Sequence, residues 1–229
     1  MIKDKPIYIC EQHEMAFYYW CKAKKEMNIE EFFLVTIDKH KDLMTWGLQS
    51  EVQKEISQLD LNDLVKIRKL AACPRPRNNL TYRQSRAAME AGVVRDVLIV
   101  SPEIPCEEIY EDLSERKHRI FHCAHPNNLQ DLLINNRSLK ESIDYPDGNS
   151  IILDIDLDFF TSLDDQSVPH VISKENFKNI FSNDSLIWWT REKARLITIS
   201  KESFWCGGID NSEHVFKLLK TCFLNRTNK

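Results

Sequence analysis

Short apolar runs recur along the chain, and longer stretches with a helical spacing of apolar residues separate them. The runs are rich in Ile, Val, Leu and Phe, as strands buried on both faces of a sheet are. They predict strands over residues 6–10, 32–37, 96–101, 119–123, 150–155 and 196–200. The longer stretches predict helices over residues 15–27, 49–67, 82–91, 128–139, 173–181 and 212–224. Gly92 suits a C-cap for the third helix.

Strands that alternate with helices indicate an α/β domain with a mainly parallel sheet between two helical layers. A chain of 229 residues fits one domain of this three-layer αβα class. No internal repeat or Gly/Ser linker divides it, and it holds only five glycines. We therefore expect residues 1–229 to form a single domain.

Composition and charge limit the kinds of partner. The chain has 31 Lys and Arg against 35 Asp and Glu, so its net charge is −4. It thus lacks the basic field that nucleic acid or an acidic membrane requires. Neither a signal-peptide pattern nor a membrane-spanning apolar stretch is present, and seven cysteines lack framework spacing. These features predict a cytoplasmic protein and give no indication of its oligomeric state.

The residues with the clearest chemistry follow the second predicted strand, which runs directly into an Asp-x-His-x-Asp motif. Alternate residues at a strand end point the same way. Asp38, His40 and Asp42 should therefore converge at a carboxyl end, where open α/β sheets place their sites. Two carboxylates and an imidazole suit manganese, or alternatively iron, cobalt or zinc. The alternative interpretation is an ordinary polar turn after a strand.

A second acidic motif ends the predicted strand 150–155. Asp154, Asp156 and Asp158 alternate with apolar residues after a fully apolar run. Three acids on one buried strand are costly unless a cation neutralises them. An edge strand with a solvated acidic face is the alternative, but the preceding apolar run argues against it.

His13 lies between the first predicted strand and the first predicted helix. A histidine at such a junction can aim a ring nitrogen into the cleft at the sheet edge. A capping or core role is the more common explanation for a single histidine. Its place beside the two acidic motifs favours a metal ligand here.

The order of these three motifs resembles the arginase/deacetylase superfamily, and the chain as a whole is similar to the branch that includes peptide arginases. Those enzymes convert arginine to ornithine inside ribosomally made peptides. The resemblance spans roughly residues 6–210. It implies an arginase-like fold, two manganese ions and an arginine-containing peptide as substrate. Urea would be released by attack of a metal-bridging hydroxide on the guanidinium carbon.

The resemblance also assigns roles to residues. His13 and Asp42 would bind one metal together with Asp38 and Asp154, and His40 would bind the other with Asp156. Asp38, Asp42 and Asp154 would bridge the two ions, while Asp158 has no counterpart and would lie behind the ligands. Asp42 would also hold the hydroxide by a hydrogen bond. Glu202, just after the predicted strand 196–200, matches the place of a guanidinium-binding glutamate.

The chain departs from the arginases of free arginine after Asp42. It reads Leu-Met-Thr-Trp-Gly-Leu over residues 43–48, where those enzymes have a polar loop that holds the α-amino and α-carboxylate groups. This difference favours a peptide substrate over free arginine. It also leaves the proton-shuttling histidine unassigned, with His122, His125 and His170 as candidates.

Several alternatives remain open from the sequence. A deacylase or amidohydrolase acting on another cationic amide would use the same ligands. A phosphohydrolase would use Asp154 as an aspartyl nucleophile and Asp156 as an acid, but would leave the first motif unexplained. A metal-stabilised binding module without activity is a third alternative. The loop 74–79 could be a lid or a plain surface connection, and residues 122–125 lack the second Cys/His pair of a zinc finger.

Overall fold

A computed structural model describes most of the chain. The described residues are 5–40, 42–43, 51–73, 80–81, 83–102, 108–113, 116–123, 136–144, 150–163, 169–182 and 185–224. The predicted loop 74–79, the segment 44–50 after the first acidic motif, and His125 lie outside them.

The described part contains a seven-stranded sheet in the order β1-β9-β6-β2-β3-β5-β4. Its strands are β1 (Ile7–Cys10), β2 (Phe32–Ile37), β3 (Val94–Val100), β4 (Glu108–Leu113), β5 (Arg116–Cys123), β6 (Ile151–Asp156) and β9 (Ala194–Ser200). Neighbouring strands are parallel except β4, which pairs with β5 in the antiparallel sense. The short strands β7 (Thr161–Leu163) and β8 (Pro169–Val171) form a separate antiparallel pair.

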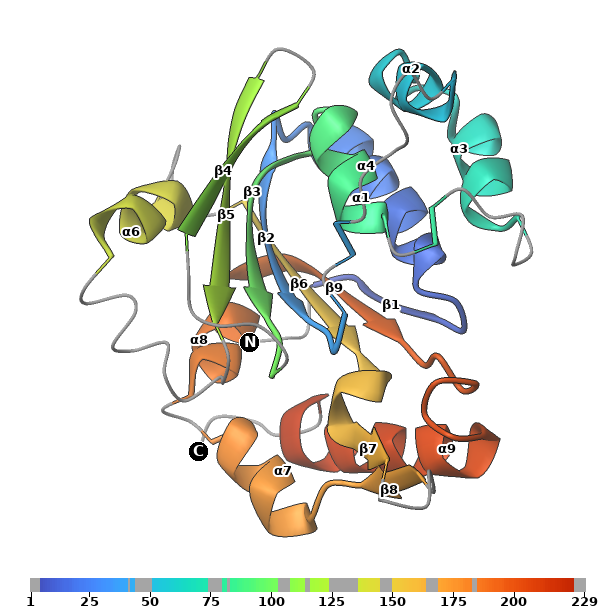
Figure 1. The fold of residues 1–229 in the computed structure, drawn as a ribbon, viewed down its shortest axis with the longest axis vertical. Helices are drawn as coiled ribbons and strands as arrows, with labels where there is room; N and C mark the ends of the chain where they lie inside the picture. The colour runs from blue at the N-terminus through green and yellow to red at the C-terminus, as the bar shows by residue number, and fades with distance from the viewer. Residues whose placement is uncertain are drawn as a thin grey trace.

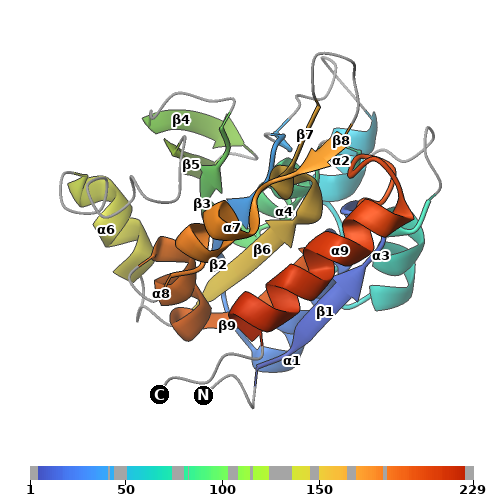
Figure 2. The same ribbon diagram turned by 90° about the horizontal axis from the view of Figure 1, so that it is seen from below.

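Helices cover both faces of the sheet and complete three layers (Figures 1 and 2). One face packs against α1 (Glu14–Met27), α2 (Glu51–Ser57), α3 (Leu64–Ala71) and α4 (Gln84–Glu90). The other packs against α6 (Arg137–Asp144), α7 (Lys174–Ile180), α8 (Leu186–Lys193) and α9 (Ile209–Leu219), which is followed by the π-helical turn Lys220–Leu224. The predicted α/β class with a mainly parallel sheet between helical layers is confirmed.

Two hydrophobic cores lie on opposite faces of the same strands. In β2, Leu34 belongs to the core under α1, and Val35 belongs to the core under α9. Large aromatics fill both cores, with Trp20 on the first face and Phe160 on the second. Burying one such side chain stabilises the fold by about 1.5–3 kcal/mol. The strands read as continuous apolar runs because both of their faces are covered.

The helix expected over residues 49–67 is interrupted. Helix α2 ends at Ser57 and α3 begins at Leu64, after a turn that uses two aspartates. Asp60 accepts a hydrogen bond from the amide of Asn62, and Asp63 caps α3 by accepting one from the amide of Lys66. A short polar side chain that bonds to nearby amides favours a cap over a helix interior, so the prediction of one helix was wrong.

Other differences lie at the edges of the elements. Strand β3 starts at Val94, two residues before the expected start, and the polar edge strand β4 was not predicted. Helix α8, capped by the Ser185 hydroxyl at the amide of Trp188, was also missed. Most of the helix expected over 128–139 lies outside the described residues, and α6 covers only its end. Among the described helices, none has the length and apolarity needed to cross a membrane.

Candidate metal centre

One face of three adjacent strands changes from apolar to polar toward the carboxyl ends. On this face β2 presents Leu34 and then Thr36, and β6 presents Ile152 and then Asp154. Alternate residues of a strand share a face. The polar side chains are therefore stacked in register at one edge, beneath the start of α1. This edge is where parallel sheets place their sites.

Asp154 lies at the centre of this polar layer. It pairs in register with Thr36 on β2 and Thr198 on β9. The Thr198 hydroxyl donates to its Oδ1, and the Thr36 hydroxyl donates to its Oδ2 at 3.0 Å. His13 Nε2 lies 2.6 Å from the same Oδ2. Both oxygens of this buried carboxylate therefore already have polar partners within the protein.

His13 stands at the N-terminus of α1, with its ring between two groups of carboxylates. An ionised carboxylate only accepts hydrogen bonds, so Asp154 fixes the proton on Nε2. Nδ1 then faces Asp38, Asp42 and Asp156, whose Oδ2 atoms lie at 3.3, 3.0 and 3.1 Å. A carboxylate behind a histidine is the usual way to orient a metal-binding imidazole.

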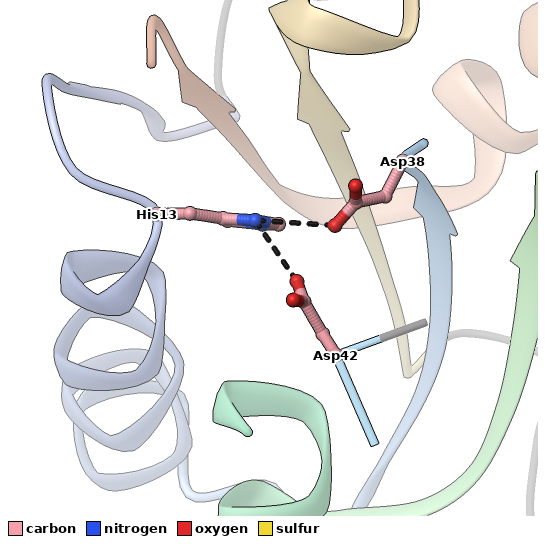
Figure 3. Close-up of side chains that lie close together, drawn as sticks. All are labelled: His13, Asp38 and Asp42. Atoms are coloured by element: carbon pink, nitrogen blue, oxygen red, sulfur yellow. Dashed lines mark ion pairs between the residues drawn. The ribbon is translucent and has the colours of Figure 1, made fainter. Parts of the chain in front are cut away.

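Figure 3 shows how His13, Asp38 and Asp42 meet. His13 comes from the start of α1, and the two aspartates come from the chain that leaves β2. Asp42 has a φ of 50°, a left-handed conformation that aspartate tolerates better than most residues. One ligand atom from each of these three buried residues lies within 4.8 Å of the others, so the group could hold a metal ion.

A second group shares Asp38 with the first. His40 Nδ1 lies 3.1 Å from Asp158 Oδ2 and 3.6 Å from Asp38 Oδ1. These three residues also have ligand atoms within 4.8 Å of one another and could hold a metal ion. Asp38 is fixed by its own turn, because its Oδ1 accepts the His40 amide at 2.7 Å.

Three carboxylate oxygens of this cluster have no hydrogen-bond donor from the described part of the chain. Asp38 Oδ2 and both side-chain oxygens of Asp158 are buried and accept no hydrogen bond there. A buried carboxylate without hydrogen bonds is costly unless a cation compensates its charge. The donor set, carboxylate oxygens with two imidazoles, is one that manganese and similar divalent ions accept.

The pKa values of the aspartates report the same crowding. Burial, and then the charge of Asp38, raise the pKa of Asp42 well above its usual value. Burial and the charge of Asp158 do the same to the pKa of Asp156. The pKa of Asp158 is raised by burial and by Asp38, although His40 opposes the change. A bound cation would oppose each of these shifts, because it favours the ionised carboxylate.

The histidines respond in the opposite direction from ordinary buried histidines. Burial acts to lower the pKa of His13, but the surrounding carboxylates, above all Asp154, raise it well above its usual value. Asp158 and then Asp38 raise the pKa of His40 to about 11. Burial acts to raise the pKa of Asp38, but His13 and His40 outweigh it, and that pKa is lowered.

Glu202 lies at the same edge, directly after β9, as the sequence predicted. It is buried, and its Oε1 accepts the backbone amide of His13 at 2.7 Å. Its φ is 43°, a conformation that costs energy for glutamate and is held by the hydrogen bond from its amide to the carbonyl of Glu11 at 3.0 Å. Glu202 therefore ties the segment after β9 to the first metal-ligand candidate.

A small cavity joins these groups. Its lining residues are His13, His40, Asp42, Gln84, Asp156, Asp158, Glu202 and Trp205. Sequence reasoning missed Gln84 and Trp205. Gln84 is buried at the start of α4 and donates through Nε2 to Asp42 Oδ2. No local motif marks it, because it reaches the site only through the packing of α4 beside α1.

The structure brings all six predicted ligands to this edge but gives two aspartates different surroundings from those expected. Asp154 was expected to bridge the metals, yet it lies behind His13 with both oxygens bonded. Asp158 was expected to lie behind the ligands, yet it lines the cavity opposite His40. Asp154 and Asp156 share one face of β6, but Asp154 lies two residues further from the end of the strand. The short 3-10 helix Leu157–Phe160 follows the strand and turns Asp158 back toward the site.

Of the histidines considered for proton transfer, the structure describes His122 and His170, and neither lines this cavity. His122 is buried on β5, and His170 is exposed on β8. Neither of them therefore lies beside the candidate metal ligands.

No protein-family model matches the chain, and no curated protein matches it either. The interpretation of the site therefore depends on its geometry and on the motifs.

Removal of the Asp158 charge should affect metal binding more than removal of the Asp154 charge. We expect Asp154→Asn to weaken manganese binding by about 10–100-fold, the usual effect of a residue that only orients a ligand. Asp158→Asn should weaken it further, because a ligand oxygen is lost. Titration calorimetry with Mn²⁺ would measure both, with exposed Asp144→Asn on α6 as the control. A larger effect at Asp154 would show that Asp154, and not Asp158, is the ligand.

Stabilisation by metal should increase with pH. The raised pKa values of Asp42, Asp156, Asp158, His13 and His40 mean that the metal-free folded protein binds more protons than the unfolded chain. Its stability therefore falls as pH rises above the unfolded values, about 4 for aspartate and 6.5 for histidine.

The lowered pKa of Asp38 has the opposite effect on stability, but that effect changes with pH only below about pH 3.8. We expect the increase in Tm on adding a fixed concentration of Mn²⁺ to be larger at pH 8 than at pH 6, as measured by thermal unfolding. An increase that is constant or smaller at pH 8 would be inconsistent with proton displacement.

Proposed function

We propose that the protein is a hydrolase that uses two divalent metal ions, manganese by preference, to convert arginine side chains of a peptide to ornithine and urea. The observation that carries this proposal is the pair of ligand groups that share Asp38, with Glu202 lining the same cavity. An arginase-like fold is part of the proposal. It is supported by the parallel sheet with the site at its carboxyl edge and by the order of the three motifs.

The geometry favours one distribution of ligands. His13 Nδ1, Asp38, Asp42 and Asp156 surround one position, and Asp38, His40 and Asp158 surround the other. Asp38 is the ligand that the two groups share. In this arrangement Asp154 orients His13 and is not itself a ligand.

Two bound divalent ions would lower the pKa of a water molecule and make hydroxide available near neutral pH. The protein's own residues then orient the reactants. Gln84 holds Asp42 through a hydrogen bond, and Asp42 would accept a hydrogen bond from the attacking water. Cleavage of the bond between the guanidinium carbon and the side-chain nitrogen gives ornithine and urea.

Glu202 is proposed to recognise the guanidinium group. A carboxylate can accept two parallel hydrogen bonds from the planar guanidinium, which fixes its orientation as well as its position. Glu202 is suited to this role because it is buried in the cavity wall and is itself held through His13. A small displacement of a reacting group lowers the rate steeply, so a fixed carboxylate is useful here.

The surroundings of Asp154 argue against the phosphohydrolase alternative. An aspartyl nucleophile needs an oxygen directed at the phosphoryl group. Both oxygens of Asp154 instead face the Thr36 and Thr198 hydroxyls and His13 within the protein interior. A deacylase acting on a cationic amide would use the same groups, and the identity of the product separates it from the proposed reaction.

Manganese-loaded protein should convert arginine to ornithine within peptides, with release of urea, and should act far less on free arginine. The reason is the apolar sequence after Asp42, which lacks the polar residues that would hold free α-amino and α-carboxylate groups. Mass spectrometry of the peptide detects the conversion, and a urea assay quantifies it. A kcat/KM for free arginine equal to that for peptides would refute the choice of substrate.

Glu202→Gln should lower kcat/KM for an arginine peptide by about 30–1,000-fold, equivalent to about 2–4 kcal/mol for the loss of a buried charge partner. The new amide oxygen can still accept the His13 amide, so the fold and metal content should be retained. Exposed Glu175→Gln on α7 is the matched control. Near-native turnover, or loss of bound metal, would show that Glu202 has a different role.

A further inference from the structure

Two exposed aromatic side chains stand at the rim of the cavity. Phe204 is 81% exposed and Trp205 is 39% exposed. Their rings meet edge to face with centroids 5.0 Å apart, and Trp205 in turn lies edge to face with His40 at 6.0 Å. Most large apolar side chains of the described residues are buried, so a pair exposed beside a candidate site is unusual and indicates a binding surface.

The backbone that carries these rings is fixed. The segment 201–208 has positive φ at Glu202, Gly207 and Gly208. Within it, the Trp205 amide donates to the Glu202 carbonyl at 2.8 Å, and the Gly208 amide donates to the Ser203 carbonyl at 2.8 Å. The aromatic pair is thus exposed by a defined turn. A surface ordered in advance loses little entropy when it binds a partner.

A cleft lies beside the metal cavity and shares two residues with it. The cleft is lined by Glu11, Gln12, Glu202, Ser203, Phe204 and Trp205. Glu202 and Trp205 also line the metal cavity. A molecule whose guanidinium lies against Glu202 therefore has the cleft directly next to the rest of its chain. Glu11 makes the cleft acidic as well as aromatic, and its side chain is fixed by the Ser203 amide at 3.1 Å.

We propose that this cleft binds the residue adjacent to the target arginine in a peptide, and that it selects an aromatic or large apolar neighbour and disfavours an acidic one. This inference rests on the proposed function. Free arginine would reach Glu202 but would offer nothing to Phe204. A neighbouring aromatic side chain could pack edge to face on the Phe204 and Trp205 rings. An acidic neighbour would meet the carboxylate of Glu11.

The test uses capped pentapeptides with arginine at the centre. One carries Phe before the arginine, one carries Phe after it, one carries Glu on either side, and one has only Gly. With manganese-loaded protein we expect kcat/KM for at least one Phe peptide to exceed that for the Gly peptide by about tenfold, the factor for about 1.4 kcal/mol of packing. The Glu peptide should be the poorest substrate.

Phe204→Ala isolates the cleft from the reaction, because Phe204 does not line the metal cavity. This variant should remove the preference for Phe and leave kcat/KM for the Gly peptide within about twofold of wild type. Phe204→Leu should restore part of the preference. Ile209→Ala is the matched control, because Ile209 is 70% exposed and lines neither the cavity nor the cleft.

Calorimetric binding of the same peptides to the manganese-loaded protein separates this inference from the proposed reaction. If no peptide releases urea, the proposed function fails. The cleft is then still supported if the Phe peptide binds about tenfold more tightly than the Gly peptide and Phe204→Ala removes the difference. Equal affinity or equal kcat/KM for the Phe and Gly peptides, or a loss in Phe204→Ala that is the same for both, would overturn the inference.

Discussion

Repulsion among buried carboxylates is the constraint on which the rest of this structure depends. Asp38, Asp42, Asp156 and Asp158 crowd one edge of the sheet, and among the described residues the imidazoles of His13 and His40 lie between them. Without a cation, three of these carboxyl groups have raised pKa values and the histidines hold protons. A divalent ion bound here would compensate these charges and would make stability depend on metal binding.

The polar layer below the cluster shows how the fold supports it. Thr36, Asp154 and Thr198 come from three adjacent strands in register, and both threonine hydroxyls donate to the Asp154 carboxylate in the interior. This layer holds His13 from behind, while the amide of His13 is held by Glu202. His13 is therefore held at its ring by Asp154 and at its backbone by Glu202, two residues that are far from it in the sequence. A site built on strand ends and a helix start can hold its geometry closely.

The segment after β9 connects the chemistry to the surface. Its first residues reach into the cavity through Glu202, and its next residues present Phe204 and Trp205 to the outside. One short turn with positive φ values thus carries both the group suited to a guanidinium and the rings suited to its neighbour. The position of the reacting side chain and the position of the rest of a peptide would be fixed together.

The sequence by itself determined the sheet strands and the location of the site, because two-sided burial leaves continuous apolar runs and the polar residues follow these runs directly. It predicted that His13, Asp38, Asp42 and Glu202 lie at one edge of the sheet, where the structure brings them together, although the break between α2 and α3 and the edge strand β4 escaped it. Only the tertiary structure decided that Asp154 faces Thr36, Thr198 and His13, that Asp158 turns back toward His40, and that Gln84 reaches Asp42. These contacts depend on strand register and on the packing of α4 beside α1, which residues distant in the sequence set together.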